Sequence, residues 1–140
     1  MAFFRFKSID SDISYMILSN IEYKVRFYED GNGKRPVLEY MDNLSDKERA
    51  KVSKYVDFLK VSGGVLDEPY SKHIKGKIRE LRVDFGKNKH RIFYFTFIEK
   101  NIIFLHAFLK KTVKTPSKEI KKAEKNYYDI INNYKTYEQK

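Results

Sequence analysis

Two arginines and two lysines in the second half of this chain have the types and spacing needed for chemistry on a phosphate. Arg82 and Arg91 lie in one stretch that alternates apolar and charged residues, and Lys110 and Lys111 follow a later apolar run. A guanidinium makes paired, permanently charged contacts to phosphate, whereas a lysine supplies a point charge whose pKa falls on partial burial. These four side chains could stabilise negative charge on a phosphodiester.

Cleavage of RNA is one reaction that such a cluster can catalyse, because the ribose 2′-hydroxyl can itself attack the adjacent phosphate. The reaction needs a base, cations on the phosphoryl oxygens and a proton source for the leaving 5′-oxygen. Glu80 or His73 could supply the base or the acid. The structural alternatives are that Glu80 and Arg82 are cross-strand surface charges and that Arg91 pairs with Asp84. Further lysines around these stretches are predicted to contact RNA: Lys75, Lys77, Lys89, Lys110, Lys114 and Lys118.

A β-hairpin is predicted to position the arginines. Apolar and charged residues alternate before a turn at residues 86–89, and a second β-rich run follows. The hairpin would carry Glu80 and Arg82 on its solvent side, with Arg91 near the start of the returning strand. A basic, exposed sheet face is unusual unless it meets something anionic.

The elements before the hairpin are predicted from local signals. Residues 23–28 alternate and indicate a first strand. Pro36 suits the first turn of a helix, and Ser45 with Glu48 forms a capping-box pattern at the start of a second helix. Residues 63–64 are both glycine and end that helix.

The remaining elements complete an α+β domain. Residues 65–77 are expected to form a loop, and residues 99–101 a second turn. The apolar run 102–109 indicates a central, buried strand, in which His106 is interpreted as a satisfied core histidine. Thr115 is the candidate N-cap of a last helix, with Pro116 at its first position.

The predicted fold is thus a small, antiparallel-rich sheet with helices packed on one face, plus a C-terminal helix. The opposite face of the sheet is then expected to be free to bind a ligand. Residues 1–20 are expected to form an N-terminal extension, with a short amphipathic helix as one possibility, and residues 21–140 a single domain.

Composition restricts the classes of partner. The 140 residues contain 29 Lys and Arg against 19 Asp and Glu, a formal net charge of +10, which favours a polyanion or an acidic protein. Basic charge that merely aids solubility is the alternative. There is no cysteine, so disulfides and thiolate metal sites are excluded. No apolar run reaches the roughly 20 residues that span a bilayer, so we expect a soluble, cytoplasmic protein without membrane contact.

Cofactor and metal motifs are missing from the sequence. The three histidines, His73, His90 and His106, are far apart, and none pairs with a carboxylate in a ligand pattern. No phosphate-binding glycine loop of the Walker or dinucleotide type occurs, and no nucleophile elbow. We therefore expect neither a cofactor nor a metal.

Several segments, taken together and in order, resemble the HigB branch of the RelE/ParE toxin superfamily, a group of phage-derived toxins. The resemblance covers about residues 23–130. The matching segments are residues 77–82, 90–94, 105–112 and 114–116, followed by Glu119, Ile120 and Ala123.

The resemblance implies a RelE/ParE-like fold and the toxin of a type II toxin–antitoxin system. Such toxins usually act as ribosome-dependent endoribonucleases that cleave mRNA in the A site. A cognate helix-turn-helix antitoxin, here HigA-like, would inhibit the toxin, and operator DNA would be bound only through their complex.

The resemblance also assigns roles to single residues. Arg91 matches the family's phosphate-stabilising arginine, Arg82 a basic position on the preceding strand, and Lys111 the basic residue after the last strand. The chain departs from the family at Glu80, where relatives carry lysine, and in lacking a counterpart of the C-terminal tyrosine of some relatives.

Two other functions fit the same residues. A toxin of this fold could instead inhibit DNA gyrase, as the ParE branch does, with no nuclease chemistry. A non-catalytic basic RNA-binding module is the third possibility. The arginines and the segment 110–112 favour cleavage over gyrase inhibition, whereas charge alone supports a binding module equally well.

Overall fold

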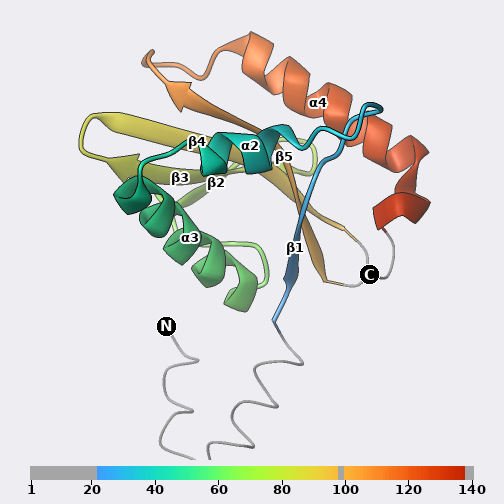
Figure 1. Cartoon of the computed structure of the whole chain (residues 1–140), viewed down its shortest axis with the longest axis horizontal. Coiled ribbons are helices and arrows are strands. Elements are labelled where there is room, and N and C mark those ends of the chain that lie inside the picture. Colours follow the sequence, from blue (N-terminus) through green and yellow to red (C-terminus); the bar gives the residue numbers. More distant parts are fainter. Residues whose placement is uncertain (1–21, 98–99, 138–140) are drawn as a thin grey trace, which may run out of the picture.

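The computed structural model describes residues 22–97 and 100–137, which form one five-stranded sheet with helices on both faces (Figure 1). The strand order is β1-β5-β4-β3-β2, with β1 parallel to β5 and the other neighbours antiparallel. The elements are β1 (Lys24–Phe27), α2 (Pro36–Asp42), α3 (Asp46–Val61), β2 (Ser71–Lys75), β3 (Ile78–Phe85), β4 (Asn88–Phe97), β5 (Asn101–Lys110), α4 (Ser117–Asn132) and the 3-10 helix η2 (Tyr134–Tyr137). The predicted α+β class is confirmed.

Local sequence signals place the first helices as expected. Pro36 occupies the start of α2, and the Ser45 hydroxyl accepts a hydrogen bond from the backbone N–H of Glu48 at the start of α3. Gly63 and Gly64 follow α3 with positive φ angles of 76° and 88°, a conformation that side chains disfavour. A Cβ on Gly64 would lie 2.5 Å from Cγ2 of Thr96, so this glycine also permits a close approach to β4.

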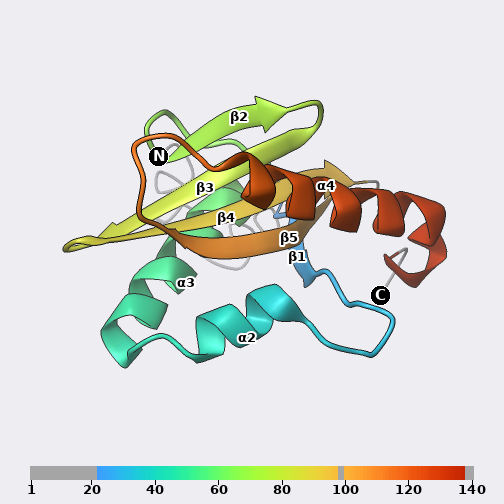
Figure 2. The same ribbon diagram turned by 90° about the horizontal axis from the view of Figure 1, so that it is seen from above.

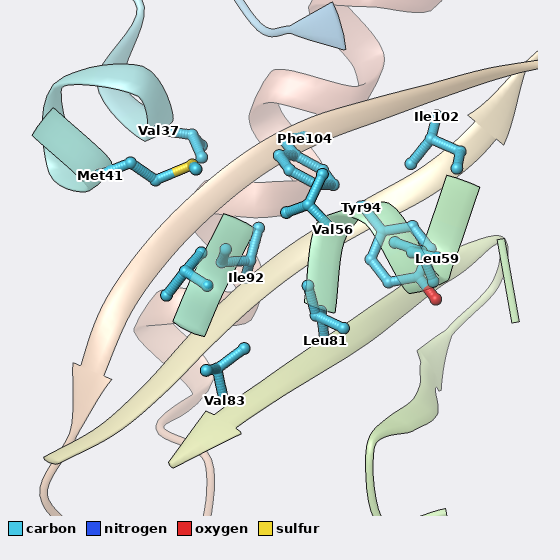
Figure 3. Packing of buried hydrophobic residues seen from close by; sticks show 11 residues of the cluster. Val37, Met41, Val56, Leu59, Leu81, Val83, Ile92, Tyr94, Ile102 and Phe104 are labelled. Atoms are coloured by element: carbon cyan, nitrogen blue, oxygen red, sulfur yellow. The ribbon is translucent and has the colours of Figure 1, made fainter. Parts of the chain in front are cut away.

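One face of the sheet packs against α2 and α3. Val37 and Met41 of α2 and Val56 and Leu59 of α3 lie over buried residues of β3, β4 and β5, including Tyr94 (Figure 3). Figure 1 shows α3 below the sheet and α4 above it. Burial of these apolar side chains is the main driving force that holds the two helices on the sheet.

The other face of the sheet is not wholly free, contrary to the expectation. Ala123 and Ile130 of α4 pack on Phe93, Phe95 and Ile103 in a second buried cluster. The amphipathic last helix needs an apolar surface, and α2 and α3 already occupy the first face. The part of this second face near the β3–β4 turn is not covered by α4 and carries charged side chains.

The sequence prediction missed one strand and misplaced one helix cap. Residues 71–75 form the edge strand β2 instead of a loop, because a short strand with few buried side chains leaves little hydrophobic pattern. Pro116, and not Thr115, is the N-cap of α4, since Pro116 has extended backbone angles and the helix begins at Ser117.

Three further expectations concern the turns and the N-terminus. The hairpin is confirmed, but its turn is shorter than the predicted 86–89: only residues 86–87 lie between β3 and β4, with a φ of 58° at Gly86, and residues 88 and 89 belong to β4. Lys100, with a φ of 60°, lies in the second predicted turn, whereas Glu99 of that turn lies outside the described residues. The possible helix in residues 1–20 also lies outside them.

Candidate functional site

Six charged residues share the open part of the second sheet face, and we call this surface the charged face: Glu80, Arg82, Asp84, Lys89, Arg91 and Lys110. Residues directly opposite each other on antiparallel strands project from the same side of a sheet. Arg82 lies opposite Arg91, and Lys89 lies opposite both Asp84 and Lys110. The hairpin thus brings the two predicted arginines together, and β5 adds a predicted lysine.

Arg91 is held tightly at the centre of the charged face. Its side chain is only 6% exposed, and Nη1 donates to Oδ1 of Asp84 at 2.7 Å and to the carbonyl oxygen of His90 at 3.0 Å. The pairing with Asp84, considered from the sequence, is therefore present. Nε of Arg91 is buried without a hydrogen-bond partner among the protein atoms, which is unusual for a guanidinium.

Glu80 is fully buried, so its expected place on the solvent side was wrong. It lies on an inner strand, opposite Lys72 of β2 and Phe93 of β4, where neighbouring side chains enclose it. Its Oε1 accepts a hydrogen bond from Nε of Arg82 at 2.8 Å; the two residues lie on the same strand, so the alternative of cross-strand surface charges was also wrong. Its Oε2 is buried without a partner, which leaves a second unsatisfied atom on this face.

The charged face carries an excess of positive charge. It contains four cationic side chains and two carboxylates. The side chain of Arg82 is 25% exposed to solvent and so accessible to a ligand. Burial lowers the pKa of Lys110, and the positive charge of nearby Arg91 lowers it further. The surface therefore favours an anion, which would relieve the repulsion among these cations.

The remaining basic candidates lie at two ends of the sheet. Lys111 and Lys114 are exposed in the loop between β5 and α4, and Lys118 is exposed in the first turn of α4. Figure 2 shows this loop at the same end of the sheet as the β3–β4 turn. Lys75 forms an ion pair with Glu124 of α4 at 3.0 Å, at the opposite end of β3.

His73 is not part of the charged face. It lies opposite Arg79, whose own partner on β4 is Tyr94 of the first core, so the strand register turns it toward the α2 and α3 side. Its Nε2 is hydrogen-bonded to the carbonyl oxygen of Gly76 at 2.7 Å. The alternation of β2 decides this placement, and that strand was not recognised from the sequence.

His106 borders the charged face and is largely satisfied, as the sequence suggested. Its Nε2 lies 2.8 Å from Oε1 of Glu119 in α4, and its ring stacks on Phe108 at 5.7 Å and 19°. Burial is the main cause that lowers the pKa of His106. A register shift between β4 and β5 next to Phe93 sets the orientation of this part of β5.

A polar network behind the site, centred on a buried histidine, was missed by sequence reasoning. His90 is 3% exposed, and its Nδ1 lies 2.7 Å from the hydroxyl of Tyr40 and its Nε2 2.5 Å from Oε2 of Glu48. Burial, together with the charge of Glu48, raises the pKa of Tyr40 to about 12. The network ties α2 and α3 to β4 at the residue before Arg91. No local pattern announces it, because its three members come from three elements.

Metal-binding groups do not converge in the described residues, since no three His, Asp or Glu side chains there form a possible cation site. Within residues 22–97 and 100–137, no helix is long and apolar enough to cross a membrane.

Comparison with known families identifies the family of this chain. A family model described as "Phage derived protein Gp49-like (DUF891)" matches residues 39–128, from α2 to α4, and so includes the whole charged face. The chain belongs to this phage-derived Gp49-like family, which is a toxin-like family of the RelE/ParE type. A search of curated proteins gave no match. The family is compatible with a toxin of a toxin–antitoxin system and implies an antitoxin partner in general.

Proposed function

We propose that this protein is the toxin of a type II toxin–antitoxin system and that it cleaves mRNA in the ribosomal A site, as HigB-like toxins do. The observation that carries the proposal is the opposed pair of Arg82 and Arg91, set beside two lysines and two carboxylates on the charged face. This arrangement suits the phosphoryl group of a single RNA strand better than a protein surface.

The cations would act on the charge that develops during cleavage. Arg91 and Arg82 would bind the phosphoryl oxygens, which gain negative charge as the ribose 2′-oxygen attacks phosphorus. The buried, unpartnered Nε of Arg91 is a donor that a phosphoryl oxygen could satisfy after a small rearrangement. Lys111, exposed after β5, would contact a neighbouring phosphate, and Lys89, Lys114 and Lys118 would hold the flanking strand.

Proton transfer completes the reaction. Glu80, through its unpartnered Oε2, is our candidate to take the proton of the 2′-hydroxyl once neighbouring side chains move aside. Lys110 is our candidate to protonate the 5′-oxygen, since its pKa is lowered. The bond between phosphorus and the 5′-oxygen breaks, which leaves a 2′,3′-cyclic phosphate and a 5′-hydroxyl. His73 has no role in this scheme because it lies on the other side of the sheet.

Partners follow from the same proposal. The antitoxin would be a small helix-turn-helix protein of the HigA type, and operator DNA would be bound only by the toxin–antitoxin complex. The ribosome and mRNA would be the targets in the cytoplasm, with residues 21–140 as the toxin domain and residues 1–20 as an extension of it.

A non-catalytic RNA-binding module is the second candidate. It is favoured by the 6% exposure of Arg91 and its ion pair with Asp84, because a neutralised, buried arginine contributes less to catalysis than a free one. Under this alternative a change at Arg91 lowers only the affinity for RNA. Inhibition of gyrase would instead leave RNA intact.

The test is inducible expression in bacterial cells with mapping of mRNA 5′ ends, comparing the wild type with Arg91→Ala. Arg35→Ala is the matched control, since Arg35 pairs with Glu29 at 3.0 Å in an exposed ion pair away from the charged face. We expect codon-phased cuts within translated frames that Arg91→Ala loses and Arg35→Ala keeps. Growth arrest without cuts would favour a protein target such as gyrase, and no arrest would favour the binding module.

A further inference from the structure

A cavity of about 280 Å³ lies between α4 and the turn that joins β2 to β3. Figure 2 shows this turn and α4 at the same end of the sheet. The cavity is lined by Lys75, Gly76, Lys77 and Ile78 from the strands and by Glu124, Tyr127 and Tyr128 from the helix. None of the roles assigned to the charged face uses it.

The lining combines exposed aromatic surface with positive charge. Tyr128 is 59% exposed, although an isolated tyrosine on a helix gains little from exposure to water. Its neighbour Tyr127 packs edge to face against the buried ring of Phe95, with ring centroids 4.7 Å apart. The rings of Tyr127 and Tyr128 also meet edge to face, with centroids 5.3 Å apart. Lys77 is exposed in the turn. The cavity thus offers two adjoining aromatic rings, one of them packed on the core, next to a cation.

The cavity and the charged face lie on the same side of the sheet. Ile78 lines the cavity and packs in the same buried cluster as Phe93, which is a direct neighbour of Glu80. Arg82 is four residues further along β3, which corresponds to about 13 Å at the usual rise of a strand. Lys72 lies opposite Glu80 on β2 and is exposed, so a cation lies between the cavity and Arg82.

We propose that this cavity is a nucleotide-binding subsite for single-stranded RNA that runs from the charged face along β3 and β2. One base would stack on Tyr128, Lys77 would contact the adjoining phosphate, and Glu124 would accept a hydrogen bond from a base amino group. Aromatic stacking next to a positively charged groove is a general way to bind single strands with little sequence preference. The inference rests on the proposed function, since it assumes that RNA is the ligand of the charged face.

The experiment measures binding of full-length protein to a fluorescent, 2′-O-methylated decaribonucleotide, which lacks the attacking hydroxyl and cannot be cut. We compare the wild type, Tyr128→Ala, Lys77→Ala and the control Tyr134→Ala. Tyr134 is also an exposed tyrosine, at 42%, but does not line the cavity. Tyr128→Ala should weaken binding by about fivefold or more, which is the lower range for one stacked base.

The outcomes separate the subsite from the proposed function. Unchanged decanucleotide affinity of Tyr128→Ala, in a variant with a wild-type circular dichroism spectrum, would overturn the subsite. Equal losses in Tyr128→Ala and Tyr134→Ala would overturn it as well. A wild type that binds the probe through Tyr128 but cuts no translated mRNA would refute the proposed function and leave the subsite standing.

Discussion

Replacement of Arg91 by alanine should abolish cleavage and leave the fold intact. The stability cost is small because the partner carboxylate of Asp84 is 57% exposed, so water solvates it when the guanidinium is removed. An ion pair with one exposed member contributes about 1 kcal/mol or less, and the lost packing of the arginine stem adds a similar amount. A native domain has roughly 5–15 kcal/mol of stability, so Arg91→Ala remains folded.

The catalytic cost of Arg91→Ala is larger. Loss of one fixed donor to a developing oxyanion lowers kcat by about 10²–10³-fold in enzymes where it has been removed. We expect a similar reduction, since Arg91 is held by two hydrogen bonds from a single nitrogen and needs little reorganisation to act. Arg91→Lys should lie between the wild type and alanine, because it keeps the charge but loses the planar fork.

The assay is cleavage of a defined message in a cell-free translation reaction, with thermal unfolding of the same preparations. Asp84→Asn is the matched control, since it breaks the same ion pair but keeps the arginine. We expect this control to cleave at least as fast as the wild type, because the amide oxygen of asparagine can still accept the hydrogen bond that orients Arg91 while a negative charge is removed from the charged face. A folded Arg91→Ala variant that cleaves within tenfold of the wild-type rate would refute the role of Arg91.

Three further predictions concern neighbouring groups. Lys110→Gln should weaken RNA binding and reduce the slope of log Kd against log salt concentration by about one, as measured by fluorescence anisotropy; an unchanged slope would remove Lys110 from the RNA contacts. The hydrogen bond from His90 lowers the pKa of Glu48 below its usual 4.5, so this stabilisation is complete above pH 4.5 and is lost as the pH falls through the folded-state value. Urea unfolding of Glu48→Gln should therefore show a smaller loss of stability below pH 4.5 than the wild type, and equal losses would contradict the assignment. Gly64→Ala should cost at least about 1 kcal/mol in thermal unfolding, because of its φ of 88° and the contact with Thr96, and Thr96→Ala should recover part of this cost.

Local signals explain what could be predicted of the fold. The Ser45 cap, the glycines after α3 and the hairpin turn each depend on a few consecutive residues, and each lies where the sequence indicates it. β2 depends on pairing with β3 and on little else, since its side chains are mostly exposed at the sheet edge. A strand whose stability comes from its neighbour leaves a weak trace in its own sequence.

For the site as well, features set by neighbouring residues could be predicted, whereas features set by contacts between elements could not. That Arg82 and Arg91 share one hairpin was predictable, but their direct pairing was not, because it follows from the two-residue turn 86–87 and the predicted turn 86–89 would give another register. The burial of Glu80 and the placement of His73 depend instead on β2, which the sequence did not reveal. The contacts of His106 with Glu119 and of His90 with Tyr40 join elements distant in the chain, so only the folded structure brings them together.

The position of Arg91 is determined from both sides of the sheet. On the charged face, Asp84 orients the guanidinium through Nη1, and on the opposite face the preceding residue, His90, is anchored to α2 by Tyr40 and to α3 by Glu48. Successive residues of a strand project from opposite faces, so an anchor on His90 restrains the backbone from which Arg91 projects. A cation that must meet a phosphoryl group in one geometry benefits from such support, because less ordering remains to be done on binding. This polar network is therefore best understood as the structural basis for the rigid placement of Arg91, and it accounts for a histidine buried on the α2 and α3 side of the sheet.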